Sequence, residues 1–380
     1  MVQVQMRGPD DRHELLTRAQ QAFSDAAYTV CVVKSSAVVD FIAKPEVTEE
    51  GSRDPDHLHE NRIFLKVLGN VETFKDRHAL EMKIHCQFLD GTPLLVAARY
   101  SKHTIQNGVI YLRHSISCVN VSTLENLLGN GINPCRVAVR GSPSPSVSID
   151  GGRLASLFDQ TRSKTQKEIC NDLSLPRQSL LGYFKEQVKP TVERFNLIVS
   201  YLAQNTGISK AKVEEEILKP IDVLSAEKRD PETDLNQLEQ AFGSPKNSLE
   251  KEVKEHLQRI NIQSIWFHSL PWDGLISFPS ENPNDNVKAT NQNEDRAFTG
   301  IAPLSSDLHR YRQRMGASSE ILGNLNQNLM VIVEDEDLTP SDLADDPRHF
   351  SVISVNKFFG INRAKDLKHE IRESKGKISL

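Results

Sequence analysis

The chain has 380 residues, of which 38% are hydrophobic and 26% are charged, a length that corresponds to roughly two or three domains of ~100–200 residues. It holds no run of ~20 apolar residues, which excludes a membrane-spanning helix, and no apolar stretch near its start that predicts a secretory signal. The formal net charge is −5, yet residues 151–220 hold 11 Lys and Arg against 8 Asp and Glu, which indicates a polyanionic partner for this block.

The first block, residues 1–140, is predicted to be an α/β domain. Residues 13–26 have the period of an amphipathic helix. Short runs rich in apolar and β-branched residues follow, separated by further helical segments and by a polar loop over residues 45–61. Strands are predicted at residues 28–34, 38–43, 63–68, 93–98 and 109–112, and helices at residues 75–88 and 123–128.

Residues 141–150 are rich in Ser and Pro, lack a helical period and are predicted to form a linker. The following block, residues 151–222, is predicted to be all-α, with four short helices around one small core. Within it, residues 165–185 have the spacing of a helix-turn-helix, in which two short helices cross around a tight turn. The residues predicted to anchor these two helices are Ile169, Cys170, Leu173, Leu175, Leu180 and either Tyr183 or Phe184.

The second of these two helices, about residues 176–186, is predicted to expose a polar face. This face consists of long hydrogen-bond donors and small residues, which suits a helix that lies in the major groove of DNA. Arg can bond guanine O6 and N7, and Gln can bond adenine N6 and N7. The alternative is a helical bundle or protein scaffold that never meets DNA. The residues of the face are Arg177, Gln178, Ser179, Gly182 and Lys185.

After a polar, charged linker at residues 223–248, the third block, residues 249–380, is predicted to be a second α/β domain and a probable repeat of the first. What repeats is the order of elements and the position of one aspartate, although any two α/β domains share part of such an order. The predicted helices cover residues 249–260, 307–325 and 364–367, and the predicted strands cover residues 263–268, 272–277, 296–302, 328–333 and 350–354.

Residues 151 to about 205 resemble the Xre/Cro family of helix-turn-helix domains, in which short helices surround one core. The resemblance implies that Thr165 and Gln166 touch a phosphate or the edge of the site. It further implies that Arg177, Gln178, Ser179 and Gly182 face the bases, and that Tyr183, Lys185 and Lys189 lie near the DNA backbone.

Two positions depart from the family pattern. Ser174 stands where the turn usually has glycine, so a positive φ there is predicted to be strained. Pro176 stands where the second helix usually has a Ser or Thr cap, which a first helical turn tolerates because the missing N–H has no partner there anyway. We therefore expect Ser174 to serve as the cap.

Nearly the full chain resembles archaeal helix-turn-helix transcriptional regulators, cytoplasmic proteins with an Xre/Cro-type domain between α/β flanks. The resemblance implies DNA binding and transcriptional control, and it does not identify the regulated genes. The segments that carry it are Phe64–Asn70, Thr92–Val96, Gly108–His114, Gly151–Leu154 and Lys219–Asp222.

The order α-β-β-β-α-β of the flanks, with an aspartate leading the second strand, also resembles the restriction-endonuclease-like fold. Such nucleases hold Mg²⁺ with an Asp and the acidic residue of a Glu-x-Lys or Asp-x-Lys motif. Asp40 and Lys66 fit two of these three positions, but Phe64 occupies the third. In the third block Asp273 fits, and Phe298 and Gly300 replace the other two residues. We therefore predict degenerate flanks without catalytic residues, the alternative being a metal-dependent nuclease or DNA-processing enzyme.

No metal or cofactor site is predicted. The five cysteines are scattered without a CxxC motif, no glycine-rich phosphate loop is present, and His57 and His59 lack a third ligand. This cysteine usage favours a reducing, cytoplasmic environment. The predicted partners are double-stranded DNA and either a second copy of the chain or, through intrachain pairing, the other α/β domain.

Overall fold

The computed structural model describes residues 9–33, 36–46, 62–89, 91–138, 145–161, 165–224, 247–267, 272–278, 296–302, 329–334 and 350–373, together with isolated positions between them. Several predicted segments lie outside the described residues: most of the polar loop at residues 45–61, most of the linker at residues 223–248, most of the helix at residues 307–325, and the pair His57 and His59. Within the described residues, no helix is both long and apolar enough to span a membrane.

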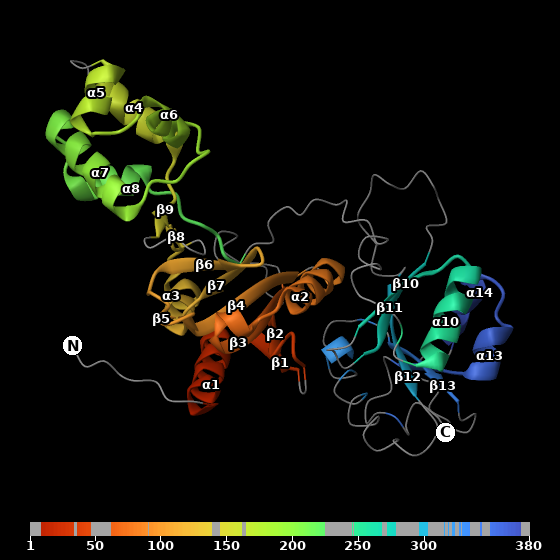
Figure 1. The fold of residues 1–380 in the computed structure, drawn as a ribbon. Helices are drawn as coiled ribbons and strands as arrows, with labels where there is room; N and C mark the ends of the chain where they lie inside the picture. Colours follow the sequence, from red (N-terminus) through yellow and green to blue (C-terminus); the bar gives the residue numbers. More distant parts are fainter. Residues whose placement is uncertain are drawn as a thin grey trace. The chain divides into compact units, whose positions relative to one another are not determined.

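The chain divides into two compact units. The first consists of Met1–Thr29, Lys44–Asp76 and Thr92–Ser225. The second consists of Val30–Ala43, Arg77–Gly91 and Ala226–Leu380. The structure is mixed α/β, with two sheets and a group of helices, α4 to α8, that follows strand β9 in the chain (Figure 1).

The N-terminal part of the chain builds a nine-stranded sheet in the order β1-β2-β3-β4-β7-β6-β8-β9, with β5 paired to β4. Strands β6 and β7 form an antiparallel hairpin, whereas β4 pairs with β7, and β6 with β8, in parallel. The strands are β1 Tyr28–Val32, β2 Phe41–Pro45, β3 Arg62–Asn70, β4 Gly91–Tyr100, β5 His103–Thr104, β6 Val109–Arg113, β7 Ile116–Val119, β8 Arg136–Ala138 and β9 Ser146–Val147. The helices are α1 Pro9–Asp25, η1 Val71–Thr73, α2 Asp76–Phe88 and α3 Val121–Asn130.

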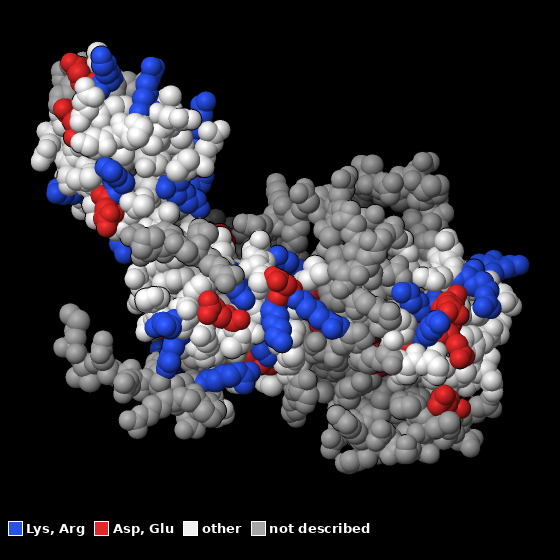
Figure 2. All heavy atoms as spheres, in the orientation of Figure 1, with Lys and Arg blue, Asp and Glu red and all other residues white. Residues whose placement is uncertain are grey.

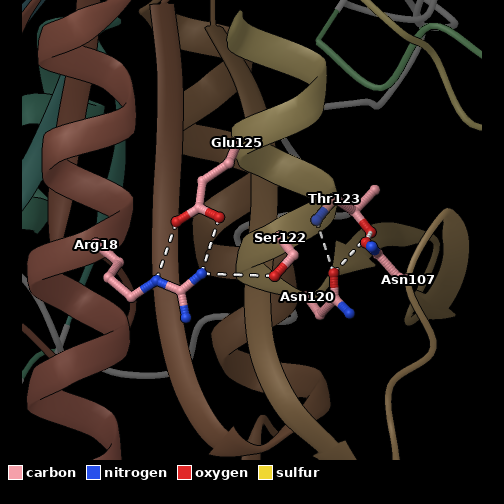
Figure 3. A network of polar contacts seen from close by, with 6 residues as sticks. All are labelled: Arg18, Asn107, Asn120, Ser122, Thr123 and Glu125. Carbon is pink, nitrogen blue, oxygen red and sulfur yellow. Dashed lines mark hydrogen bonds and ion pairs between the residues drawn. The ribbon is translucent and has the colours of Figure 1, made fainter. Parts of the chain in front are cut away.

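Helices α1 and α3 are joined by polar contacts (Figure 3). Arg18 on α1 donates from Nε to Glu125 Oε1 at 3.0 Å and from an Nη to Glu125 Oε2 at 2.8 Å. This two-point geometry is stronger and more directional than a single surface ion pair. Beside it, Asn120 caps α3 by accepting from the Thr123 N–H, and the Thr123 hydroxyl lies 3.0 Å from Asn107 Oδ1. The two helices therefore hold a fixed relation at this end of the first unit.

Five helices of the described chain form one group around a single core: α4 Gly151–Gln160, α5 Gln166–Asp172, α6 Arg177–Phe184, α7 Val192–Thr206 and α8 Lys210–Ile217. The group has one helix more than predicted, because Val213 and Ile217 of α8 are fully buried in the same core. Side-chain caps begin α4, α5, α7 and α8, which fixes where each helix starts.

The segment predicted as a linker at residues 141–150 contains strand β9, which pairs with β8 of the sheet. Beyond β9, Ser148 N–H donates to Cys135 O at 2.7 Å. The chain that leaves the helices bonds to the chain that enters, because Lys219 N–H donates to Ser148 O at 3.1 Å. Ile221 N–H then donates to Pro134 O at 3.0 Å. Both connections of the helical group to the sheet are thus held by backbone hydrogen bonds.

The second unit contains a five-stranded sheet in the order β10-β11-β12-β13-β14. The first four strands of this order, β10 to β13, follow one another in the chain, and β14 pairs in parallel with β13. The larger sheet has the same pattern, with β1 to β4 in chain order and β7 paired in parallel with β4. Three helices pack their apolar residues on one face of this sheet. The elements are α10 Ser248–Arg259, β10 Gln263–Trp266, β11 Gly274–Ser277, β12 Arg296–Ala302, β13 Leu329–Val333, β14 Phe350–Ser354, α13 Val355–Gly360 and α14 Ala364–Glu373.

A buried histidine of α2 packs within the second unit. The ring of His85 lies 4.3 Å from that of Phe267 between centroids, and Trp272 Nε1 donates to His85 Nε2 at 3.0 Å. Because an indole N–H can only donate, Nε2 carries no proton, and Nδ1 donates instead to Glu81 O at 2.6 Å. Burial, opposed by that backbone bond, lowers the pKa of His85 to about 3, so the imidazole is neutral.

Candidate nucleic-acid interface

The start of α5 is fixed by a reciprocal cap. The backbone N–H of Thr165 donates to Glu168 Oε2 at 2.6 Å, and the Glu168 N–H donates to Thr165 Oγ1 at 3.4 Å. The Thr165 hydroxyl also donates to the Glu168 carboxylate at 2.8 Å. Thr165 is exposed, as a phosphate contact requires. Its hydroxyl proton, however, is already donated to the Glu168 carboxylate. Gln166 begins α5, and its side chain lies outside the described residues.

A tight turn separates α5 from α6. Leu175 N–H donates back to Cys170 O at 2.9 Å, and the side chains of Leu173 and Leu175 are buried. Ser174 adopts a φ of 49°, as the turn requires, a conformation that costs a non-glycine residue about 1–3 kcal/mol. The expectation that Ser174 caps α6 is wrong. The N-cap is Pro176, which has no side-chain oxygen, so α6 starts without a side-chain cap.

Helix α6 is anchored by buried Leu180 and presents a polar face to solvent. Arg177, Gln178 and Lys185 are exposed, and Ser179 is half-buried. These four were all predicted for this face. The sequence analysis missed Leu181, which lies one turn after Arg177 and is 37% exposed. Its exposure could have been expected from its spacing of four residues to Arg177 and Lys185 on the same helical row.

Two predicted contact residues are placed elsewhere. Gly182 is buried and does not face outward, because Val188 from the following turn lies over it. A β-carbon at Gly182 would be 3.2 Å from Val188 Cγ2, so a larger residue here would have to push the Val188 side chain aside by a few tenths of an ångström. Tyr183 is also buried, with 6% of its surface exposed, and belongs to the helical core rather than to a backbone-contacting rim.

Glu186 holds the C-terminal end of α6 in place. It adopts a φ of 56°, accepts a hydrogen bond from the Gly151 N–H at 3.2 Å, and contacts Lys219 Nζ at 2.6 Å. The hydrogen bond from Lys219, with a smaller effect of the Gly151 N–H, lowers the pKa of Glu186, so the carboxylate is charged. The end of α6, the start of α4 and the segment that follows α8 thus meet at Glu186. This contact sets the position of the exposed face of α6.

The surface of the helical group carries several cations. Lys and Arg side chains project from it in Figure 2, where the group lies at the upper left, and Asp and Glu are fewer there. In the described chain the exposed cations nearest in sequence to α6 are Lys167, Arg177, Lys185 and Lys189. Exposed acidic residues in the same stretch are Glu168, Asp172, Glu186 and Glu193. The positive charge that suits a polyanion therefore comes from residues 177–185, which hold Arg177 and Lys185 and no acidic residue.

The residues singled out in the flanks are buried. Asp40 is 8% exposed just before β2, Lys66 is 6% exposed on β3, and Phe64 is 1% exposed where a nuclease has its second carboxylate. In the second sheet, Asp273 Oδ2 accepts from the Ile301 N–H at 2.9 Å, so this aspartate has a structural partner. Within the described residues, no group of three or more His, Cys, Asp or Glu is placed to hold a metal ion.

Comparison with known proteins identifies two kinds of similarity. Residues 12–134 match the model of the PD-(D/E)XK superfamily domain. Archaeal relatives carry the name putative HTH-type transcriptional regulatory protein, where HTH stands for helix-turn-helix. The protein of Pyrococcus abyssi is 28% identical over 221 residues, 58% of this chain and 63% of the relative. That of Pyrococcus horikoshii is 27% identical over 214 residues, 56% and 61% of the two chains.

A third relative with the same name, from Thermococcus gammatolerans, is 25% identical over 312 residues, 82% of this chain and 87% of the relative. The matches to the two Pyrococcus proteins span less than two thirds of those proteins. No solved structure matches the chain. The chain is thus similar over residues 12–134 to a PD-(D/E)XK superfamily domain, and over longer stretches to archaeal proteins named as transcriptional regulators.

Proposed function

We propose that this protein is a sequence-specific DNA-binding transcriptional regulator, with α5 and α6 as an Xre/Cro-type helix-turn-helix. One observation carries the proposal: α6 is anchored from beneath by Leu180 while Arg177, Gln178 and Lys185 stay exposed on its outer face. A recognition helix needs this division, because base edges are reached only by side chains free to enter the groove. The names of the archaeal relatives support the same function.

The roles of the exposed residues follow from their chemistry. Arg177 and Gln178 stand in the first turn of α6, where a recognition helix commonly meets bases, and can bond guanine and adenine respectively. The first amides of α6 lack a side-chain cap and can donate to a phosphate. Lys185 and Lys189 supply charge for the DNA backbone. Such domains usually act as two-fold dimers with half-sites about 34 Å apart, and the α/β parts can supply that pairing.

We propose further that the α/β parts act in architecture rather than in catalysis, and that both descend from one nuclease-like fold. Their shared strand order, with a parallel fifth strand, supports the second point. For the first, Phe64 offers no ligand where a nuclease needs its second carboxylate, and a single carboxylate is a poor Mg²⁺ site.

The match to the PD-(D/E)XK model makes a metal-dependent nuclease the second candidate. A plasmid-nicking assay with Mg²⁺ or Mn²⁺ separates the two functions. We expect no cleavage above that of the buffer. Cleavage that is lost in Asp40→Ala, with the variant still folded by circular dichroism, would establish the nuclease and overturn the architectural assignment.

The DNA-binding proposal is tested by selecting duplexes from a random pool with the full chain and measuring affinity at two salt concentrations. Arg177→Ala is expected to lose about 1–3 kcal/mol on the selected duplex and little on random DNA. The matched control is Arg153→Ala, which changes an exposed arginine on α4 outside the proposed face. It is expected to leave the preference for the selected duplex over random DNA unchanged. Failure of the full chain to prefer any duplex at low salt would favour the protein-scaffold alternative.

A further inference from the structure

Two exposed apolar side chains interrupt the polar face of α6. Leu181 is 37% exposed and Val188 is 51% exposed, although the core of the same helical group is well packed. Isolated exposed apolar residues are common on protein surfaces. These two differ because Leu181 lies between the exposed Arg177 and Lys185 along α6, and Val188 folds back over Gly182 of the same helix.

Their positions are fixed by the backbone. Leu181 lies one turn after Arg177 and one turn before Lys185, so the three form one row along the exposed side of α6. The turn after α6 folds back onto the helix, since the N–H groups of Gln187 and Val188 both donate to Gly182 O, at 3.0 and 3.3 Å. The side chain of Val188 thereby covers Gly182, the neighbour of Leu181.

We propose that Leu181 and Val188 recognise the C5-methyl groups of thymine bases in the bound duplex. The inference rests on the proposed DNA-binding function and names the bases read by this part of the face. In the major groove, the thymine methyl is the apolar group that a base edge offers, and aliphatic side chains are its natural partners. A preference for thymine opposite the middle of α6 follows, beside the contacts of Arg177 and Gln178.

The charges around the pair favour DNA over a protein as the occupant. Arg177 and Lys185 lie on either side of Leu181, and Lys189 follows Val188, all three exposed. The carboxylate that follows Lys185, Glu186, is charged but is paired with Lys219 and the Gly151 N–H, which offset its charge. An apolar centre with a cationic border fits a groove between phosphate chains.

The test uses the duplex selected by the full chain, with its thymines replaced one at a time by deoxyuridine. This change removes one methyl group and leaves the hydrogen-bonding edge intact. Burial of one methyl contributes about 0.8 kcal/mol, so we expect about fourfold weaker binding at one or two positions. In Leu181→Ala or Val188→Ala, binding at the corresponding position should become indifferent to the methyl. Leu197→Ala, a 51% exposed leucine on α7, is the control and should keep the full methyl effect.

The outcomes separate this inference from the function on which it rests. If the full chain prefers no duplex, the DNA-binding function itself fails. If it binds selectively but tolerates uracil at every position, or if the uracil penalty persists in both Leu181→Ala and Val188→Ala, the thymine assignment is wrong and the function stands. Neither Leu181 nor Val188 belongs to the buried core of the helical group, so neither substitution opens a cavity in that core.

Discussion

Two adjacent glycines at the start of α4 are expected to respond to the same substitution with opposite signs. A β-carbon at Gly151 would lie 2.7 Å from the carbonyl oxygen of Tyr183 and closer still to that of Phe184. Both are backbone atoms at the end of α6 and cannot turn aside. A β-carbon at Gly152 would meet only Asp150 Oδ1, at an ordinary 3.4 Å. Only the first substitution must therefore separate α4 from α6.

The magnitudes follow from these contacts. Overpacking a tight site costs typically 1–3 kcal/mol, and the Gly151→Ala clash with backbone belongs near the upper end, about 2–3 kcal/mol. Gly152→Ala keeps the helical geometry and removes backbone freedom from the unfolded chain, which stabilises by about 0.5–1 kcal/mol at most. Each variant adds one methyl group to the wild-type chain, and the two positions are adjacent. Each variant is therefore the matched control of the other.

Amide hydrogen exchange of α4 and α6 is the appropriate assay, because a chain with two compact units need not unfold in one step. We expect exchange from these helices to be about 30-fold faster or more in Gly151→Ala, which corresponds to about 2 kcal/mol, and unchanged or slower in Gly152→Ala. Affinity for the selected duplex should fall with Gly151→Ala alone. Equal protection in both variants would refute the argument that contact between α4 and the end of α6 positions the exposed face.

Two further predictions concern the second unit. Because the pKa of His85 is about 3 when folded and ordinary when unfolded, the unfolded chain binds the extra proton, so the stability of this unit should fall as pH drops from about 6.5 towards 3, by about 1.4 kcal/mol per pH unit. Chemical denaturation should show this dependence of the free energy of unfolding on pH in the wild type and in the exposed control His103→Gln. A dependence in His85→Gln as steep as in the wild type would contradict the assignment to His85. Asp273→Ala should cost about 1–3 kcal/mol because it leaves the buried N–H of Ile301 without its acceptor, whereas Asp273→Asn, which can still accept that bond, should lose less; equal stability of the two in thermal unfolding would disprove the structural role.

Local chemistry made much of the helical group predictable from sequence. Leu173, Leu175 and Leu180 have the spacing of two helices around a turn, and each is buried as expected. The strained φ of Ser174 also followed, because a turn at that position leaves few conformations for any residue. Gln178 could be placed on the outer face because it falls nearly opposite the buried Leu180 on the helix.

Contacts between a helix or strand and residues outside it could not be predicted in this way. Gly182 has the same helical period as the exposed residues, and only the fold-back of Val188 buries it. Strand β9 lies within a Ser- and Pro-rich stretch that has no strand pattern, and its pairing with β8 decides its conformation. Likewise, no local pattern predicts that Glu186 contacts Gly151 and Lys219, because these residues lie 35 and 33 residues away from it in the chain.

The sequence by itself determined most of the described helices and strands (though not α8 or β9), the anchored turn between α5 and α6, and the identity of the donors on the outer face, since helical period and turn chemistry act over a few residues. The tertiary structure alone decided which of those face residues remain accessible. Burial depends on what the rest of the chain lays over each position, as Val188 does at Gly182, and that arrangement is fixed only when the chain is folded.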